Sequence, residues 1–250
     1  MRFKTPGLLL LGAMALATAG TAQEPPAPQT ITRTLVAATK LSILADAPLH
    51  FKAVSVALQP GEKSEFSAAH SILYQMSGST EVSRGGEAKT LNPGEGLFID
   101  GGTKATLTAG HGAPSAFLHF FLLPAADMER PVENAPAVVR ELFRTATPIP
   151  DLPPGAYDLN LTRVTFPANA PSNPPHHRSG AALYYIVSGV GANTIDGKIE
   201  ARGPGSVVFE PHALVHQWGN PGAELLIFLA FNISPQGVAA VLPGAPAQKQ

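Results

Sequence analysis

The sequence predicts an all-β protein built from two tandem copies of one small antiparallel barrel. Short runs of β-branched and aromatic residues, such as LTRVTF, YYIV and LLIFLAF, alternate with Gly, Pro, Asn and Asp. Similar blocks recur at an offset of 111 residues: LYQMSG ends at Gly78 and YYIVSG at Gly189, while AFLHFFLLP ends at Pro124 and IFLAFNISP at Pro235. A constant offset without gaps indicates a duplicated domain. Many short strands with few helices between them favour a barrel or a sandwich.

One segment between the two copies has a helical pattern. In NAPAVVRELFRT, Asn134 can cap a helix, Pro136 suits its first turn, and the apolar residues at 138, 139, 142 and 143 share one helical face. We therefore expect one connecting helix over residues 134–145. The stretch TPIPDLPPGAY that follows is rich in proline, which is excluded from sheet interiors, and so predicts an extended connector.

The first residues have the pattern of a signal peptide. Arg2 and Lys4 precede an apolar run over residues 7–19, and small residues lead up to Ala22. The run is shorter than the ~20 apolar residues that span a bilayer, and no cysteine offers a lipid anchor. We expect cleavage after Ala22 and an exported mature protein, either periplasmic or secreted.

Composition excludes several classes of chemistry. The chain has no cysteine, so disulfides, thiolate ligands and cysteine nucleophiles are ruled out. The formal net charge is −1 and no basic stripe is present, which argues against nucleic acid and anionic membranes as partners. No phosphate-binding loop, dinucleotide fingerprint or serine elbow is present either. This composition is compatible with a small-molecule ligand, or with a second copy of the chain in a homodimer, as partner.

The second copy contains the most specific motif in the chain. Gly205 is followed by SVVFE and then by Pro211, Ala213, His216 and Asn220. This spacing resembles the second motif of the cupin superfamily, G-x5-P-x-G-x2-H-x3-N, with Ala213 in place of the inner glycine. The resemblance is to two-domain bicupins of the quercetinase-like, cupin type-2 kind. It implies jelly-roll barrels (double-stranded β-helices) with a site inside the barrel.

The first cupin motif, G-x5-H-x-H-x(3,4)-E-x6-G, is degenerate in this chain. Counted back from the last glycine of the motif, the glutamate position falls on Ala182, and the two histidine positions fall on His176 and Arg178. The resemblance therefore leaves His176 and His216 as metal ligands. His177 can join them only if the strand entry is bulged, because neighbouring residues of a regular strand face opposite sides.

His176, His177 and His216 are thus the candidate ligands for one divalent transition metal, which could be Fe, Mn, Cu, Zn or Ni. A catalytic metal normally has three protein ligands and an open position. Such a site would make the protein a metal-dependent oxygenase, isomerase or hydrolase, as cupin relatives often are.

Arg178 favours a different kind of site. A guanidinium repels a divalent cation in a pocket of low dielectric, whereas it holds a carboxylate or a phosphate through two hydrogen bonds. By strand alternation, Tyr184 shares the face of Ala182, and Trp218 shares the face of His216. Arg178, Tyr184 and Trp218 are therefore the candidate ligand-binding residues of a pocket for a small, acidic organic molecule.

The first copy lacks histidines at the positions that the resemblance indicates. At the same offset, the family positions fall on Glu65, Ser67, Ser71 and Ala105. His119, in FLHFF, lies in a strand whose inward face the sequence does not assign. We expect this copy to be a structural barrel that orients the other one.

These observations divide the chain into six segments: a signal peptide (1–22), a proline-rich linker (23–34), a degenerate barrel (35–125), a helix with a proline-rich connector (126–155), the second barrel (156–243) and a disordered tail (244–250). Three functions stay open. The first is an exported binding protein for a small acid, the second is a metal-dependent cupin enzyme, and the third is a structural or partner-binding dimer. A fold alone does not decide between them.

Overall fold

The computed structural model describes residues 28–42, 48–67 and 69–244. The signal peptide, the start of the linker and nearly all of the tail expected from the sequence lie outside the described residues. Within the described ranges, no helix is long and apolar enough to cross a membrane.

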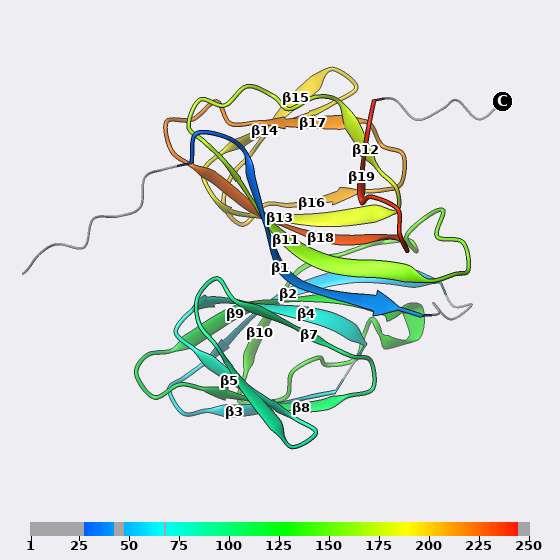
Figure 1. Ribbon diagram of the computed structural model, residues 1–250. Coiled ribbons are helices and arrows are strands. Elements are labelled where there is room, and N and C mark those ends of the chain that lie inside the picture. The colour runs from blue at the N-terminus through cyan, green and yellow to red at the C-terminus, as the bar shows by residue number, and fades with distance from the viewer. Residues whose placement is uncertain (1–27, 43–47, 68, 245–250) are drawn as a thin grey trace, which may run out of the picture.

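The first barrel consists of two antiparallel sheets that face each other (Figure 1). One sheet contains, in spatial order, β10 (Val138–Arg144), β2 (Leu49–Leu58), β9 (Ser115–Pro124), β4 (His70–Ser77) and β7 (Gly96–Ile99). The other contains β3 (Lys63–Ser67), β8 (Lys104–Ala109), β5 (Thr80–Arg84) and β6 (Glu87–Leu91). A short 3-10 turn, η1 (Ala125–Asp127), follows β9 and is the only helical element in the described residues.

The second barrel repeats this arrangement (Figure 1). Its larger sheet contains β1 (Thr32–Leu41), β11 (Tyr157–Phe166), β18 (Leu226–Pro235), β13 (Ala181–Ser188) and β16 (Val207–Glu210). Its smaller sheet contains β15 (Lys198–Arg202), β14 (Gly191–Ile195), β17 (His216–Gly219), β12 (His176–Arg178) and β19 (Val241–Pro243). The prediction of an all-β fold with two tandem barrels is confirmed.

The structural repeat follows the offset found in the sequence. Strands β4, β5, β6, β7 and β9 correspond residue for residue to β13, β14, β15, β16 and β18 when their numbers are raised by 111. The glycines that end the two matching blocks, Gly78 and Gly189, both adopt positive φ, at 64° and 76°. Because only glycine takes this conformation without strain, the turn after each strand explains why both blocks end on it.

The two barrels exchange their edge strands. β1 comes directly before β2 in the chain, yet it pairs along its length with β11 of the second barrel. β10 comes directly before β11, yet it pairs with β2 of the first barrel. Each large sheet is therefore completed by the strand that precedes the other barrel. Residues 32–34, expected in a linker, and 35–41, expected in the first barrel, are strand residues of the second barrel's sheet.

The prediction of a helix over residues 134–145 is wrong, because residues 138–144 of this segment form the strand β10. The register of β10 against β2 shifts between Glu141 and Phe143, which marks a β-bulge. The bulge resets the alternation, so both Leu142 and Phe143 pack against the core. In the sequence, two adjacent apolar residues at 142 and 143 after the pair at 138 and 139 give the spacing of one helical face. The β-branched pair at 138–139 and the free edge of β2 favour the extended form.

The large sheets of the two barrels share one hydrophobic core. The ring of Phe231 on β18 lies 5.2 Å from that of Phe51 on β2 and 5.6 Å from that of Phe120 on β9, measured between centroids. All three side chains are fully buried. Each barrel also has an interior of its own. In the second barrel this interior is aromatic, with Tyr184 and Trp218 among its members, and it borders the cavity described next.

Candidate functional site

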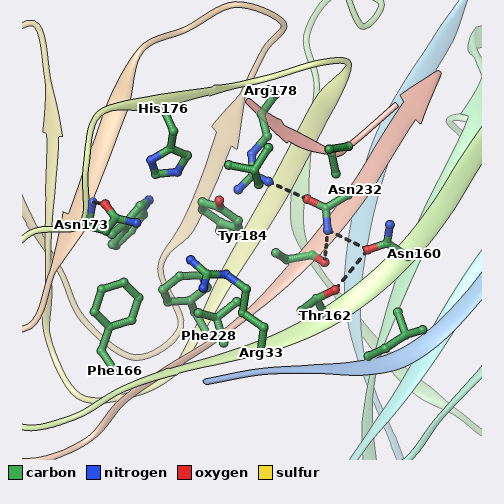
Figure 2. Close-up of a pocket in the computed structure, with 17 residues that line it drawn as sticks. Arg33, Asn160, Thr162, Phe166, Asn173, His176, Arg178, Tyr184, Phe228 and Asn232 are labelled. Carbon is green, nitrogen blue, oxygen red and sulfur yellow. Dashed lines mark hydrogen bonds between the residues drawn. The ribbon is translucent and has the colours of Figure 1, made fainter. Parts of the chain in front are cut away.

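The second barrel encloses a cavity of about 360 Å³ (Figure 2). Its walls come from both sheets of the barrel, from β1 and from the segment 239–241 near the end of the described chain. Alternate residues of each strand face inward, as pleating requires: 160, 162, 164 and 166 on β11, and 228, 230 and 232 on β18. The same alternation on β1 brings Arg33 and Leu35 into the cavity.

The structure places four of the residues singled out in the sequence on the cavity wall. These are His176, Arg178, Tyr184 and Trp218. His177 lies on the other face of β12, where its Nδ1 is 3.1 Å from the carbonyl oxygen of Gly244. His177 is therefore not brought together with the other two candidate metal ligands.

Glu210 at the end of β16 is the centre of the polar cluster beneath the cavity. Its side chain is fully buried. Arg178 Nε donates to Oε2 at 2.9 Å, and the indole Nε1 of Trp218 donates to Oε1 at 2.9 Å. His216 Nε2 lies 2.9 Å from Oε2, at an angle outside that of a normal hydrogen bond. Two nitrogen donors and one imidazole nitrogen thus surround one carboxylate.

Glu210 replaces a carboxylate that the first motif lacks. The motif position for glutamate is Ala182 on β13, and the strand register puts Glu210 directly opposite Ala182. The small alanine side chain leaves room for a carboxylate that comes from the neighbouring strand. Sequence reasoning missed this residue because it considered only the motif position. A small residue there, with a glutamate just before the motif proline, is the signal that would have found it.

Burial and charge act in opposite directions on the Glu210 carboxyl. Burial raises its pKa, while the charge of Arg178 and the contacts with His216 and Trp218 lower it. The lowering effects prevail, so the pKa stays below its ordinary value and the carboxylate is ionised. Arg178 is itself only 4% exposed. The pair is therefore a buried ion pair whose charges cancel.

His176 and His216 lie against each other with their ring centroids 4.2 Å apart. The Nδ1 of His176 donates to the carbonyl oxygen of Pro174 at 2.9 Å, and the Nδ1 of His216 donates to that of Leu214 at 2.9 Å. Burial is the main cause that lowers the pKa of His176 to about 4, so this ring is neutral near pH 7. Its Nε2 is left as a hydrogen-bond acceptor beside the cavity.

The described residues do not fit a resident metal ion. The residues most similar to a cupin ligand set are His176, His216 and Glu210. Both carboxylate oxygens of Glu210, however, already accept hydrogen bonds. The Arg178 guanidinium lies on Oε2, where a metal would have to bind, and two cations cannot share one buried carboxylate oxygen at low cost. Within the part of the chain that the structure describes, no group of three or more His, Asp or Glu is arranged to hold a metal.

A chain of amides extends the cluster along the cavity wall (Figure 2). Arg178 Nη1 donates to Asn232 Oδ1 at 3.1 Å, and Asn232 Nδ2 donates to Asn160 Oδ1 at 2.9 Å. Thr162 Oγ1 donates to the same Asn160 oxygen at 3.2 Å. The guanidinium also lies over the ring of Tyr184, with its central carbon 5.0 Å from the ring centroid. Asn160 and Asn232 carry no motif, so the sequence did not indicate them.

The first barrel has a buried polar cluster in the same region. His119 is fully buried, with Nδ1 in contact with Glu133 Oε1 and Nε2 3.0 Å from Ser71 Oγ. Ser71 stands where the family glutamate position falls. Phe66 and Phe121 flank the imidazole, with ring centroids 4.7 and 4.2 Å away. The sequence did not assign the side of the strand from which His119 projects. In the structure, His119 points into the barrel interior.

The comparisons with known proteins agree with this architecture. Residues 162–232 match the family model described as a cupin domain. No curated protein sequence matches the chain.

Several solved structures share the fold. AerE from Microcystis aeruginosa has a TM-score of 0.54 at 16% identity, over 82% of this chain and 97% of that one. Oxalate decarboxylase from Bacillus subtilis, described for its Mn(II) centres, has a TM-score of 0.54 at 15% identity, over 82% and 74% of the two chains. A variant of salicylate 1,2-dioxygenase from Pseudoaminobacter salicylatoxidans has a TM-score of 0.50 at 12% identity, over 77% of each chain.

At these identities the likeness extends to the fold and not to the site. The matched domain, the repeated sheets and the shared fold nevertheless agree with the motif of the second copy. The second barrel thus matches the cupin domain model, and the chain has the fold of two cupin barrels in tandem.

Proposed function

We propose that this protein is an exported binding protein that holds a small organic acid in the cavity of its second barrel without a metal ion. The observation that carries the proposal is the position of Arg178. It stands where the cupin pattern has its second histidine, and its guanidinium occupies the Glu210 oxygen that a metal would need. The permanently charged guanidinium of Arg178 thus takes the place of the metal ion.

The chemistry of the cavity wall supports an oxygen-rich ligand. Arg178 uses Nε and Nη1 within the protein, and its Nη2 has no partner among the described residues. The hydroxyl of Tyr184 makes no hydrogen bond there either, and it lies in the cavity wall. These N–H and O–H groups are donors for ligand oxygens, while Phe166 and Phe228 supply apolar surface.

A metal-dependent enzyme is the alternative, and it requires Arg178 to leave Glu210. The Glu210 carboxylate would then be free to act as a metal ligand together with His176 and His216. The proposal and the alternative therefore differ in one measurable property, which is whether metal and acid compete for the site or act together.

Binding of acids with and without a chelator tests the proposal. The chain has a single tryptophan, Trp218, in the cavity wall, so its fluorescence reports occupancy. Protein purified without a metal-binding tag is titrated with benzoate, salicylate and oxalate, in the presence and absence of EDTA. We expect at least one acid to bind with an affinity that EDTA leaves unchanged. Affinity that disappears with EDTA and returns with one equivalent of Fe, Mn, Cu, Zn or Ni would replace the proposal by the enzyme.

A pair of double variants checks the location of the ligand. Replacing Arg178 and Glu210 together by methionine removes the guanidinium and leaves no unpaired buried charge. The matched control is the same exchange at Arg144 and Glu141, an ion pair on β10 far from the cavity. We expect the first double variant to lose acid binding and the second to keep it. Equal affinities in both would place the ligand elsewhere.

Export is tested separately by the N-terminal sequence of the mature protein. The proposal expects the first residue to be Gln23, from cleavage after Ala22. A mature protein that still begins at Met1 would contradict export.

A further inference from the structure

One cationic side chain in the cavity wall, Arg33, is exposed and has no acidic partner among the residues that the structure describes. Arg178 is balanced by Glu210, and His176 is a neutral ring whose Nδ1–H is donated to a backbone carbonyl. Arg33, from β1, lines the cavity, and within the described residues its guanidinium makes neither an ion pair nor a hydrogen bond. No Asp or Glu side chain is part of the cavity wall. An occupant with one negative charge would therefore find in Arg33 a cation that no acidic side chain of the wall already pairs.

The direction of the hydrogen bonds fixes what the wall offers next to that charge. A guanidinium can only donate, so Asn232 must turn its oxygen to Arg178 and its nitrogen to Asn160. Asn160 then accepts through its oxygen, and its Nδ2 has no partner among the described residues. The charge of Arg178 thus makes Asn160 a donor in the cavity wall.

His176 is the exception in this donor-rich wall. Its Nδ1 is committed to Pro174, so Nε2 has a lone pair and no proton. Within the described residues this nitrogen makes no hydrogen bond, and the residue lines the cavity. A ligand group that contacts Nε2 must donate, and a carboxylate cannot do so. A hydroxyl can.

We infer that the occupant is a monoanionic hydroxy acid with an apolar body the size of one ring, whose carboxylate binds Arg33 and whose hydroxyl donates to His176. The inference rests on the proposed function and names its ligand class. The aromatic wall suits a ring, and a cavity of about 360 Å³ is near the lower end of the volumes that hold organic ligands. Arg33 reaches this cavity only because β1 is exchanged into the second barrel.

Matched probes separate the charge from the hydroxyl. The anion 3-hydroxybenzoate carries both, benzoate lacks the hydroxyl, and 3-hydroxybenzamide lacks the charge. The variant Arg33→Gln removes the charge, and Arg33→Lys keeps it. The control Lys40→Gln removes one positive charge from the same strand at a residue outside the cavity wall. Affinities are measured by calorimetry on the full mature chain.

We expect Arg33→Gln to weaken 3-hydroxybenzoate binding by at least about tenfold, as for the loss of a charge-assisted hydrogen bond. Binding of 3-hydroxybenzamide should stay within about twofold, and Lys40→Gln should bind both compounds like the wild type. Arg33→Lys should recover part of the lost affinity, because it keeps the charge but not the planar fork. In His176→Phe, the preference for 3-hydroxybenzoate over benzoate should disappear.

Two results would overturn the inference while leaving the proposed function intact. One is acid binding that Arg33→Gln does not change, and the other is equal affinity of the wild type for benzoate and 3-hydroxybenzoate. A wild type that binds no acid at all, with a fluorescence signal from Trp218 that no probe perturbs, would overturn both.

Discussion

Replacing Glu210 by alanine should lower the free energy of unfolding of the second barrel more than any other single change in its polar cluster. The substitution leaves the Arg178 guanidinium, 4% exposed, without its counter-charge, and the Trp218 N–H without an acceptor. Breaking a buried ion pair costs about 3–5 kcal/mol. An orphaned buried donor adds about 1 kcal/mol or more. The sum is about 5 kcal/mol, which corresponds to a fall in Tm of about 10–20 °C for a chain of this length.

The assay is thermal or urea unfolding followed through the fluorescence of Trp218, the sole tryptophan of the chain. Glu210→Gln keeps the shape and an acceptor but loses the charge, so its stability should lie between those of Glu210→Ala and the wild type. The double variant with Arg178→Met and Glu210→Met should recover most of the loss, since no charge stays buried and unpaired and the Trp218 N–H is the donor left without Glu210.

A double variant as unstable as Glu210→Ala would show that the ion pair is not the reason for the loss. A fall in Tm below about 3 °C in Glu210→Ala, which is less than about 1 kcal/mol, would refute the description of the cluster as a buried, charge-balanced pair.

Three further predictions concern stability. The pKa of His176 falls from 6.5 to about 4 on folding, so the unfolded chain gains a proton that the folded chain does not. Stability should therefore decrease by up to about 3 kcal/mol as the pH is lowered from 6.5 to 4, and a urea series that is as steep in His176→Phe would contradict this. Glu133→Ala, which removes the partner of His119 Nδ1 but leaves Ser71 at Nε2, should cost about 1–3 kcal/mol without changing acid affinity, and calorimetry of both properties checks it. Phe231→Ala should cost about 3–5 kcal/mol and lower one common melting transition, whereas two separate transitions would speak against a shared core.

Much of the architecture was accessible from local patterns. Strand length, turn residues and the constant offset are properties of short segments, and they predicted two tandem barrels correctly. Strand alternation also has a local cause, so the spacing of His176 and Arg178 indicated one shared face. The structure places both of them on the cavity wall.

The exchange of β1 and β10 was not accessible in this way. Either strand could pair with the free edge of β2 or of β11, and only the complete fold decides between these edges. Arg33 was missed for this reason, since its strand belongs by sequence to the other barrel. The bulge in β10 hid the strand, because a break in alternation resembles helical spacing.

Glu210 was missed because a sequence motif gives spacings along the chain and does not give the register between neighbouring strands. Its position opposite Ala182 depends on the pairing of β16 with β13, which no spacing along the chain reveals. Asn160 and Asn232 share this property, since they meet only through the pairing of β11 with β18.

The edge-strand exchange also bears on how the molecule would respond to a cut between its halves. Leu41 pairs with Tyr157 and Thr32 with Thr165, so the leading strand lies in a sheet formed by residues more than 100 positions further along. A protease that cleaved the connector between β10 and β11 would produce an N-terminal fragment that still carries a strand of the C-terminal one. The two pieces would remain joined by nine residue pairs between β1 and β11 and by the shared aromatic core. The halves are thus built to complement each other as a split protein does.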